Sequence, residues 1–206
     1  MPAPRSSIAR TTTKGGWRRS PTRGGAALIG YSLGGRLVLH AALRDPGRYR
    51  ALIVVGSSGG LDDPAEREAR READERLAAW IEATPIEQVA DYWERQPVFA
   101  DQSDALVDEQ RPGRLAQDPA RLATLLRTAG QGALAPVWED LPTLELPVLA
   151  LVGERDEPYR AASARLAGLA PNASAATVED AGHAAHLQRP EAVAKLAVDF
   201  LDEHLG

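Results

Sequence analysis

The sequence predicts an α/β fold, a mostly parallel β-sheet with an inserted group of helices. Residues 26–30, 51–55 and 147–152 are short apolar runs without alternation, which is typical of strands buried on both faces of a parallel sheet. Residues 33–43 have apolar positions at helical spacing, so the first two runs and this helix form a strand–helix–strand unit. The region 62–130 has helix signals and almost no strand signal, which indicates the insertion.

Proline and apolar spacing predict the remaining elements. Proline is accepted in the first turn of a helix, because the amide that it lacks has no partner there. On this basis we expect inserted helices at 63–82, 85–95 and 118–130. We then expect a helix at 159–168, a weaker strand at 175–178 and a closing helix at 190–204. With 206 residues, 44% of them hydrophobic, we expect one domain over 26–206 with a helical cap at about 62–140.

The charges are unevenly distributed along the chain. Residues 1–25 hold six basic residues and no acidic ones, whereas residues 26–206 hold 18 basic and 29 acidic residues, a net charge of −11. A body this acidic is not expected to bind nucleic acid. The basic head is poor in aliphatic residues, so we expect it to be disordered or irregular, with a basic arm or a transit peptide as alternatives.

The chain has no cysteine, which excludes disulfides, thiolate metal sites and a cysteine nucleophile. Its apolar runs are much shorter than the roughly 18 residues of a membrane-spanning helix, and residues 1–25 lack the apolar centre of a secretory signal. We therefore expect a cytoplasmic protein without membrane insertion.

Residues 30–34 fit G-x-S-x-G, the pattern of a nucleophile elbow between a strand and a helix. The turn is strained at the serine, and glycines two positions to either side are expected to let strand and helix approach closely. Ser32 would stand at the carboxyl end of the sheet, where the amide of Leu33 can donate to a developing oxyanion. The alternative is that Gly30 ends a strand and Ser32 merely caps a helix.

A serine nucleophile needs an orienting acid and a histidine, in that order along the chain for this type of elbow. Asp156 follows the strand at 147–152, at the sheet edge where such sites assemble, and is our first candidate for the acid. Glu154 is the second candidate. The alternative is that both acids cap the next helix.

His183 is the candidate for the histidine. It follows a glycine directly in the loop after the strand at 175–178, which again places it at the carboxyl edge of the sheet. We expect His186 to start the next segment or to line the pocket. His40 and His204 are expected to be bystanders, as most isolated histidines are.

Together these motifs resemble the α/β-hydrolase fold. The resemblance is carried by residues 30–36, 153–156 and 182–186. More narrowly, the chain resembles the family of synthases that form 2-succinyl-6-hydroxy-2,4-cyclohexadiene-1-carboxylate in menaquinone biosynthesis. This narrower resemblance rests on Arg36 after the elbow and on the cap segments 66–74 and 93–100, and it extends over about residues 26–204.

The family resemblance implies a lyase rather than a hydrolase. Its substrate is 2-succinyl-5-enolpyruvyl-6-hydroxy-3-cyclohexene-1-carboxylate, from which pyruvate is expelled after a proton is removed from a carbon next to a carbonyl group. Ser32 would act as the base and His183 would activate it. Asp156 would fix the tautomer of the imidazole.

The substrate implied by the resemblance carries several carboxylates, and a guanidinium group binds a carboxylate through two hydrogen bonds. By motif match, this role falls to Arg36 and, secondarily, to Arg70 and Arg114, although the last two also suit a solvated helix face. Three aromatic residues complete the expected substrate pocket: Tyr31, Trp93 and Phe99. Trp93 and Phe99 would otherwise belong to the core of the cap.

The chain departs from the family pattern ahead of Ser32. Family members place several strands and a His-Gly turn there, and that turn supplies a second oxyanion amide, whereas here 31 mostly polar and basic residues precede the serine. We therefore expect a chain that lacks the family's N-terminal part. The strand at 26–30 would lie at an open sheet edge and favour self-association. The missing amide would lower turnover by roughly 10²–10³-fold.

Two other functions remain open from the sequence. One is a generic serine esterase or lactonase that forms an acyl-enzyme. The other is a catalytically impaired homologue that acts as an interaction module through its sheet edge. The expected partner is a small polycarboxylate, and no cofactor or metal is expected, because His183 and His186 have no clear third ligand.

Overall fold

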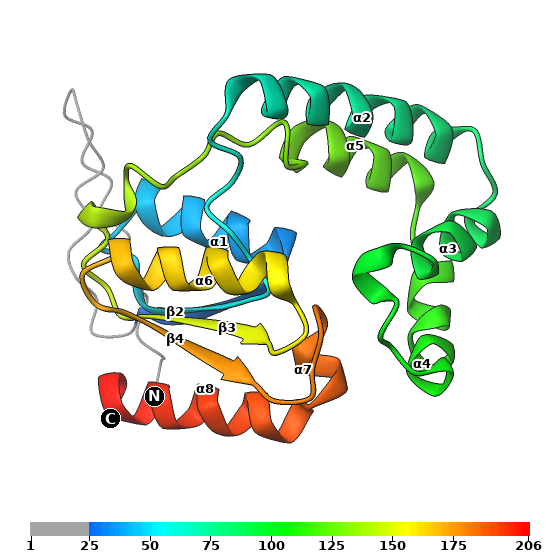
Figure 1. Cartoon of the computed structure of the whole chain (residues 1–206). Helices are drawn as coiled ribbons and strands as arrows, with labels where there is room; N and C mark the ends of the chain where they lie inside the picture. The colour runs from blue at the N-terminus through cyan, green and yellow to red at the C-terminus, as the bar shows by residue number, and fades with distance from the viewer. Residues whose placement is uncertain (1–24) are drawn as a thin grey trace, which may run out of the picture.

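The structure, a computed structural model, describes residues 25–206. The basic head expected at residues 1–25 therefore lies outside the described residues, apart from Gly25. Figure 1 shows a sheet layered between helices, with a further group of helices on the side to which the strand arrows point. The α/β class predicted from the sequence is confirmed.

The sheet has four parallel strands in the order β1-β2-β3-β4. They are β1 (Ala26–Tyr31), β2 (Tyr49–Val55), β3 (Val148–Gly153) and β4 (Ala173–Val178). β2 and β4 begin two residues earlier than expected, because Tyr49 and Ala173 already pair with a neighbouring strand. Since all four strands run the same way, the loops after β1, β3 and β4 lie at one edge of the sheet.

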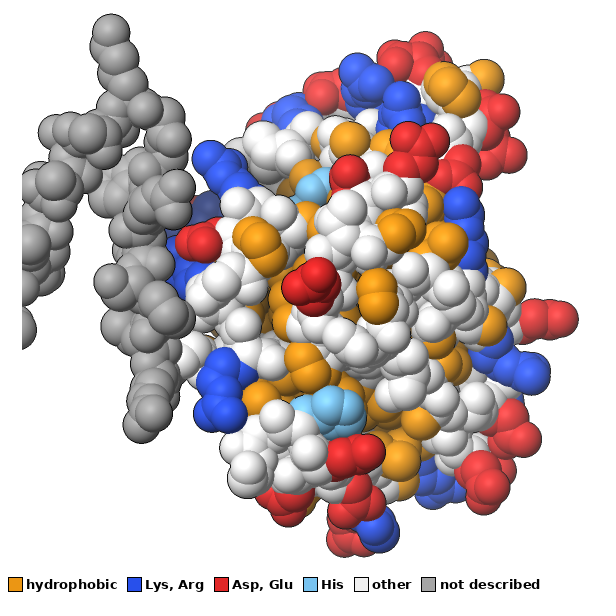
Figure 2. Space-filling model, turned by 90° about the vertical axis from the view of Figure 1, so that its left-hand side faces the viewer, with side chains coloured by type: hydrophobic (Ala, Val, Ile, Leu, Met, Phe, Trp, Pro, Cys, Tyr) orange, Lys and Arg blue, Asp and Glu red, His pale blue; other side chains and the backbone are white. Residues whose placement is uncertain are grey.

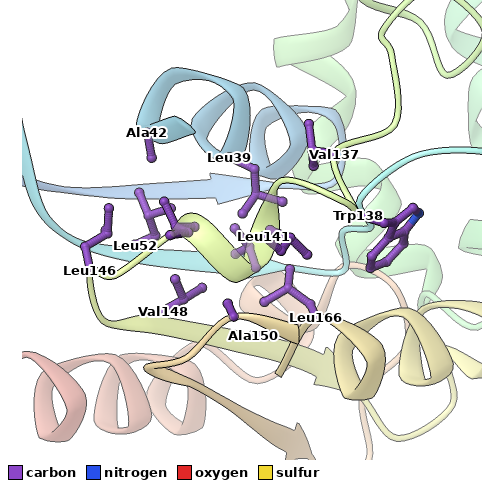
Figure 3. Packing of buried hydrophobic residues seen from close by; sticks show 13 residues of the cluster. Leu39, Ala42, Leu52, Val137, Trp138, Leu141, Leu146, Val148, Ala150 and Leu166 are labelled. Atoms are coloured by element: carbon purple, nitrogen blue, oxygen red, sulfur yellow. The ribbon is translucent and has the colours of Figure 1, made fainter. Parts of the chain in front are cut away.

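Helices cover both faces of the sheet. Those on one face are α1 (Leu33–Arg44) and α6 (Glu157–Leu169), and on the other face lies α8 (Pro190–Leu205) (Figure 1). Side chains of β2 alternate between two cores: Leu52 and Val54 pack with α1 and α6, while Ile53 and Val55 pack with α8. Figure 3 shows the first core, which also includes side chains of the segment 137–146 and its short helix η2 (Leu141–Thr143).

The cap lies between β2 and β3 in the chain. It consists of α2 (Pro64–Glu82), α3 (Ile86–Glu94), η1 (Pro97–Phe99), α4 (Asp104–Leu115) and α5 (Pro119–Ala129). α2 and α5 lie side by side (Figure 1), and together with α3 they share a small core made of Ala78, Ile81, Val89 and Ala123. Both helices have proline in the first turn, as predicted, and Asp63 and Asp118 cap them by accepting hydrogen bonds from amides of that turn.

The sequence prediction missed one cap helix, α4. None of its residues is buried, and it contains Pro112 next to Gly113, a pair that usually marks a break. Charge holds this helix in place instead, because Arg111 pairs with Asp91 and Glu94 of α3.

The described surface bears on two of the expectations. The face in Figure 2 carries basic and acidic side chains beside each other along its rim, with hydrophobic ones between them, rather than a basic stripe. Within residues 25–206, β1 has a neighbouring strand on one side only, and its Ile29 is 62% exposed. The open edge therefore exists among these residues, while self-association stays a prediction. Among the helices described here, none has the length and apolar character to cross a membrane.

Candidate active site

Ser32 occupies the turn between β1 and α1. Its φ is 49° and its ψ is −114°, a strained backbone conformation that costs on the order of 1–3 kcal/mol. The Ser32 amide donates to the Val55 carbonyl at 2.8 Å, and Ser57 Oγ donates to the Ser32 carbonyl at 2.9 Å. The Ser32 side chain makes no capping hydrogen bond, so the reading as a mere helix cap is wrong and the turn is an elbow.

The glycines around Ser32 do not contribute equally. A Cβ at Gly30 would lie 2.4 Å from the Gly34 carbonyl oxygen, so β1 and α1 can pack only because Gly30 has none. At Gly34 a Cβ would meet nothing within 4 Å, and the expectation that this glycine allows close approach is wrong. The second close contact lies at Gly35, where a Cβ would be 2.5 Å from Ser57 Cβ.

Ser32, Asp156 and His183 come together at the carboxyl edge of the sheet. His183 Nε2 lies 3.0 Å from Ser32 Oγ, and His183 Nδ1 lies 2.8 Å from Asp156 Oδ2. The histidine and the aspartate are both buried. The carboxylate therefore favours the tautomer with its proton on Nδ1, which leaves Nε2 free to accept the serine proton.

The structure distinguishes the two candidate acids. Asp156 occupies the N-cap position of α6 but makes no side-chain capping bond, because its carboxylate contacts His183. The capping alternative for Asp156 is therefore wrong. Glu154 Oε2 instead accepts a hydrogen bond from the Asp180 amide at 3.0 Å, which ties together the loops after β3 and β4.

Tyr31 lies behind the triad instead of in the substrate pocket, which corrects the expectation for this residue. Strand alternation directs its side chain to the α8 side of the sheet, where it packs with the second core. Its ring centroid lies 5.1 Å from that of His183 and 4.4 Å from that of His186. Burial raises the pKa of Tyr31, and the charge of Asp156 raises it further. Tyr31 thus keeps its proton and supports the imidazole from the side.

The other histidines lie outside the triad. His186 belongs to the short helix α7 (Ala185–Gln188), which agrees with the expectation that it starts the segment after the loop. Burial and the neighbouring His183 lower its pKa, which favours a neutral ring. His40 belongs to α1, and His204 Nδ1 lies 2.9 Å from the Phe200 carbonyl oxygen in α8. Within residues 25–206, no group of three or more His, Asp or Glu side chains is arranged to hold a metal ion.

A cavity of about 610 Å³ lies between the triad and the cap. Ser32 and His183 lie in one wall with Leu33, the residue that begins α1. The Leu33 amide has no acceptor within the helix, so it can donate to an oxyanion at this end of the cavity. Apolar side chains of α2, α3 and α5 form much of the opposite wall. The expected pocket residues Trp93 and Phe99 are both in the lining.

All three expected arginines line this cavity: Arg36, Arg70 and Arg114. Arg70 Nε donates to Asp74 at 2.8 Å, and Arg114 Nη1 donates to Glu94 at 3.1 Å, so these two cations are partly neutralised. The Arg114 side chain is 15% exposed, which argues against a solvated helix face for this residue, whereas the Arg70 side chain is 42% exposed and so faces solvent as well as the cavity.

Arg36 differs from the other two arginines. It is 3% exposed, its only protein acceptor among the described residues is the Leu134 carbonyl at 3.3 Å, and its buried Nη1 has no partner. Burial lowers its pKa, as expected for a guanidinium group that forms no salt bridge within the described residues. A buried cation without an acidic partner is expensive, and an anionic ligand in the cavity would supply one.

Sequence reasoning missed two polar residues of the cavity. Tyr159 lies three residues after Asp156 in the first turn of α6, and Gln131 follows α5. Position after the acid could have pointed to Tyr159, since a helix that starts at the site presents its first turn to it. Gln131 belongs to no motif, and nothing in the sequence sets it apart.

The chain belongs to the alpha/beta hydrolase family, whose model matches residues 8–196. It is 37% identical over 166 residues to the 2-succinyl-6-hydroxy-2,4-cyclohexadiene-1-carboxylate synthase of Klebsiella pneumoniae, covering 81% of this chain and 64% of that protein. A Bacillus subtilis protein provisionally given the same name is 33% identical over 177 residues, covering 84% of this chain and 65% of the relative. The family resemblance stated from the motifs is confirmed.

Comparison of structures agrees with the sequence comparison. The chain resembles MenH from S. aureus with a TM-score of 0.85 and 29% identity, covering 88% of this chain and 70% of the other. The chain spans about two thirds of the length of the curated relatives that it matches.

Proposed function

We propose that this chain is a carbon–oxygen lyase that eliminates pyruvate from 2-succinyl-5-enolpyruvyl-6-hydroxy-3-cyclohexene-1-carboxylate. The support comes from two sides. The relatives named above include a synthase of the corresponding product. The described residues bring a Ser-His-Asp triad to the wall of a cavity that also holds three arginines.

The buried Arg36 is the observation that carries the proposal. The substrate has three carboxylates, on the ring, on the succinyl chain and on the enolpyruvyl group, and the cavity has three guanidinium groups. Arg36 is the one without an acidic partner among the described residues. An esterase for neutral substrates gains nothing from such a cation, whereas a polycarboxylate compensates for its burial.

The triad geometry fits the proton transfers of an elimination. Ser32 Oγ gives its proton to His183 Nε2 and takes the ring proton next to the succinyl carbonyl. The electron pair shifts through the ring double bond and expels the enolpyruvyl oxygen, so one C–H bond and one C–O bond break as the conjugated diene forms. The leaving enolate takes the proton from His183 and becomes pyruvate. The Leu33 amide stabilises the charge that builds on the succinyl oxygen.

Pyruvate release from the substrate tests the proposal directly, with Ser32→Ala as the inactive reference. Arg36→Met should weaken substrate binding by about 30-fold or more, the effect of losing one partner of a buried charged contact. Arg44→Met is the matched control, because Arg44 is exposed in the last turn of the same helix. Pyruvate release no faster than that of Ser32→Ala would contradict the proposed reaction.

The cytoplasmic location expected from the sequence belongs to the same proposal, and fractionation of cells that express the chain tests it.

A serine esterase or lactonase is the second candidate. The strained elbow and the Leu33 amide suit an acyl-enzyme as well as an elimination. Labelling of Ser32 by a fluorophosphonate together with turnover of a p-nitrophenyl ester, without pyruvate release, would favour this candidate over the lyase.

A further inference from the structure

Tyr159 lies where the cap, the arginines and the triad meet. Its ring centroid is 4.6 Å from that of His183, and the residue lines the cavity together with Arg36 and Arg70. The reaction steps above do not use it. Its hydroxyl group is nevertheless a hydrogen-bonding group placed in the wall of a site that is proposed to bind carboxylates.

Hydrogen bonds orient the hydroxyl group of Tyr159. Arg70 Nη1 donates to Gln131 Oε1 at 2.7 Å, and because arginine can only donate, the amide oxygen of Gln131 must face it. The amide nitrogen of Gln131 therefore faces Tyr159 and donates to the phenol oxygen at 3.1 Å. The phenol oxygen is thus an acceptor in this chain of bonds, and within residues 25–206 its own hydrogen has no acceptor.

The phenol keeps that hydrogen in the folded protein. Burial raises the pKa of Tyr159, and the charge of Asp156 raises it further. The hydrogen bond from Gln131 and the charges of Arg70 and Arg36 act in the opposite direction, and both arginines line the same cavity as Tyr159. A neutral donor with a free hydrogen, beside two cations and inside a cavity, is placed to bind an oxygen atom that carries negative charge.

We propose that Tyr159 is a substrate-binding residue that donates its phenol hydrogen to an oxygen of the ring carboxylate or of the succinyl carboxylate, held by Arg36 and Arg70. The inference rests on the proposed function, because it names one more contact to the same polycarboxylate. It assigns Gln131 a positioning role, since this amide links the phenol to Arg70 and turns the phenol hydrogen toward the ligand.

Calorimetric binding of 2-succinylbenzoate, the dehydrated aromatic form of the proposed product, tests the inference on the full chain. Tyr159→Phe removes the hydroxyl group and keeps the ring against His183. Because the variant loses a hydrogen bond to a charged group, it should bind 2-succinylbenzoate about tenfold to a hundredfold more weakly. Tyr49→Phe is the matched control, since Tyr49 packs against the first core in β2, away from the cavity, and it should bind as the unchanged chain does.

Two shorter probes locate the contact. 4-Oxo-4-phenylbutanoate lacks the ring carboxylate, and 2-butanoylbenzoate lacks the chain carboxylate. The loss caused by Tyr159→Phe should disappear with one of these probes and persist with the other, because the hydroxyl binds one carboxylate. An equal loss with both probes would overturn the inference.

Two measurements distinguish a structural role of Tyr159 from the proposed binding role: the rate at which a fluorophosphonate labels Ser32, and the melting temperature. The labelling rate depends on the position of His183, whereas the melting temperature depends on packing throughout the fold, and both should match the unchanged chain. Unchanged affinity for 2-succinylbenzoate in Tyr159→Phe overturns the inference, and so does weaker affinity accompanied by slower labelling or lower melting. If the unchanged chain does not bind 2-succinylbenzoate, both the proposed function and this inference are overturned. If the unchanged chain binds it and Tyr159→Phe binds it equally well, only the inference is overturned.

Discussion

Gly30→Ala should destabilise the fold strongly, although the substitution adds a single methyl group. The new Cβ would lie 2.4 Å from the Gly34 carbonyl oxygen, 2.5 Å from the Gly34 carbonyl carbon and 2.7 Å from the Gly35 amide nitrogen. Ordinary contact begins at 3.4 Å, so β1 and the start of α1 would have to separate by about 1 Å. All three atoms belong to the backbone and cannot rotate away as a side chain can.

The expected loss of stability is about 3 kcal/mol, the upper end for overpacking, because the strain falls on backbone that also holds Ser32. Gly34→Ala is the matched control in the same motif. Its Cβ would meet nothing within 4 Å, and replacing a helical glycine by alanine gains up to about 1 kcal/mol. The two variants should therefore differ in sign, with the melting temperature of Gly30→Ala lower by about 6–12 °C.

Urea unfolding followed by circular dichroism measures the free energy of unfolding of each variant. The two values can be compared if this free energy depends on the urea concentration with the same slope in both variants. The rate of pyruvate release reports on the site rather than on the stability of the fold. Gly30→Ala should lose activity because Ser32 is displaced, whereas Gly34→Ala should keep it. Equal stabilities of the two variants, or greater damage at Gly34, would refute the reasoning that Gly30, and not Gly34, allows the strand and the helix to pack closely.

Three further predictions concern the site and the surface. Asp156→Asn should lower the rate of pyruvate release about 10⁴-fold, because the carboxylate no longer fixes the tautomer of His183. Glu154→Gln should leave the rate nearly unchanged. A larger loss in Glu154→Gln than in Asp156→Asn would show that Glu154 is the acid of the triad. Burial lowers the pKa of His186 in the folded protein, so the unfolded chain binds a proton at this residue more readily than the folded chain does. The free energy of unfolding, measured with urea, should therefore fall as the pH drops below about 6.5. His186→Gln should flatten that fall, and an identical pH profile would contradict it. Ile29→Lys puts a charge on the open edge of β1 and should shift size exclusion toward the monomer, whereas unchanged elution would argue against association through this edge.

The triad was predictable because each of its members is tied to backbone topology. A serine between two short-spaced glycines, an acid after one buried strand and a histidine after the next must reach the same edge once the strands are parallel. The distances of 3.0 Å and 2.8 Å around His183 follow from that topology. Motif matching also brought Arg36 to the correct wall, since it lies four positions, about one helical turn, after Ser32.

Prediction failed where a residue's role depends on which way a side chain turns at a junction. Tyr31 sits next to the serine in the sequence, yet strand alternation directs it to the opposite face of the sheet. Gly34 belongs to the motif, yet the close packing involves Gly35, because the helix turns by about 100° for each residue. Sequence proximity and motif membership do not carry this information.

The cap is least predictable because interactions among distant residues hold it together. Arg70 on α2 reaches Gln131 beyond α5, which reaches Tyr159 on α6, so three segments far apart in the chain meet in one hydrogen-bonded path. None of these bonds leaves a periodic or spaced signal, since each uses the tip of a long side chain. The chemistry at the sheet edge can therefore be predicted from motifs, whereas the selection of a substrate by the cap depends on polar contacts that only the folded chain reveals. Substrate preference should accordingly change through residues such as Tyr159 and Gln131 while the triad stays the same.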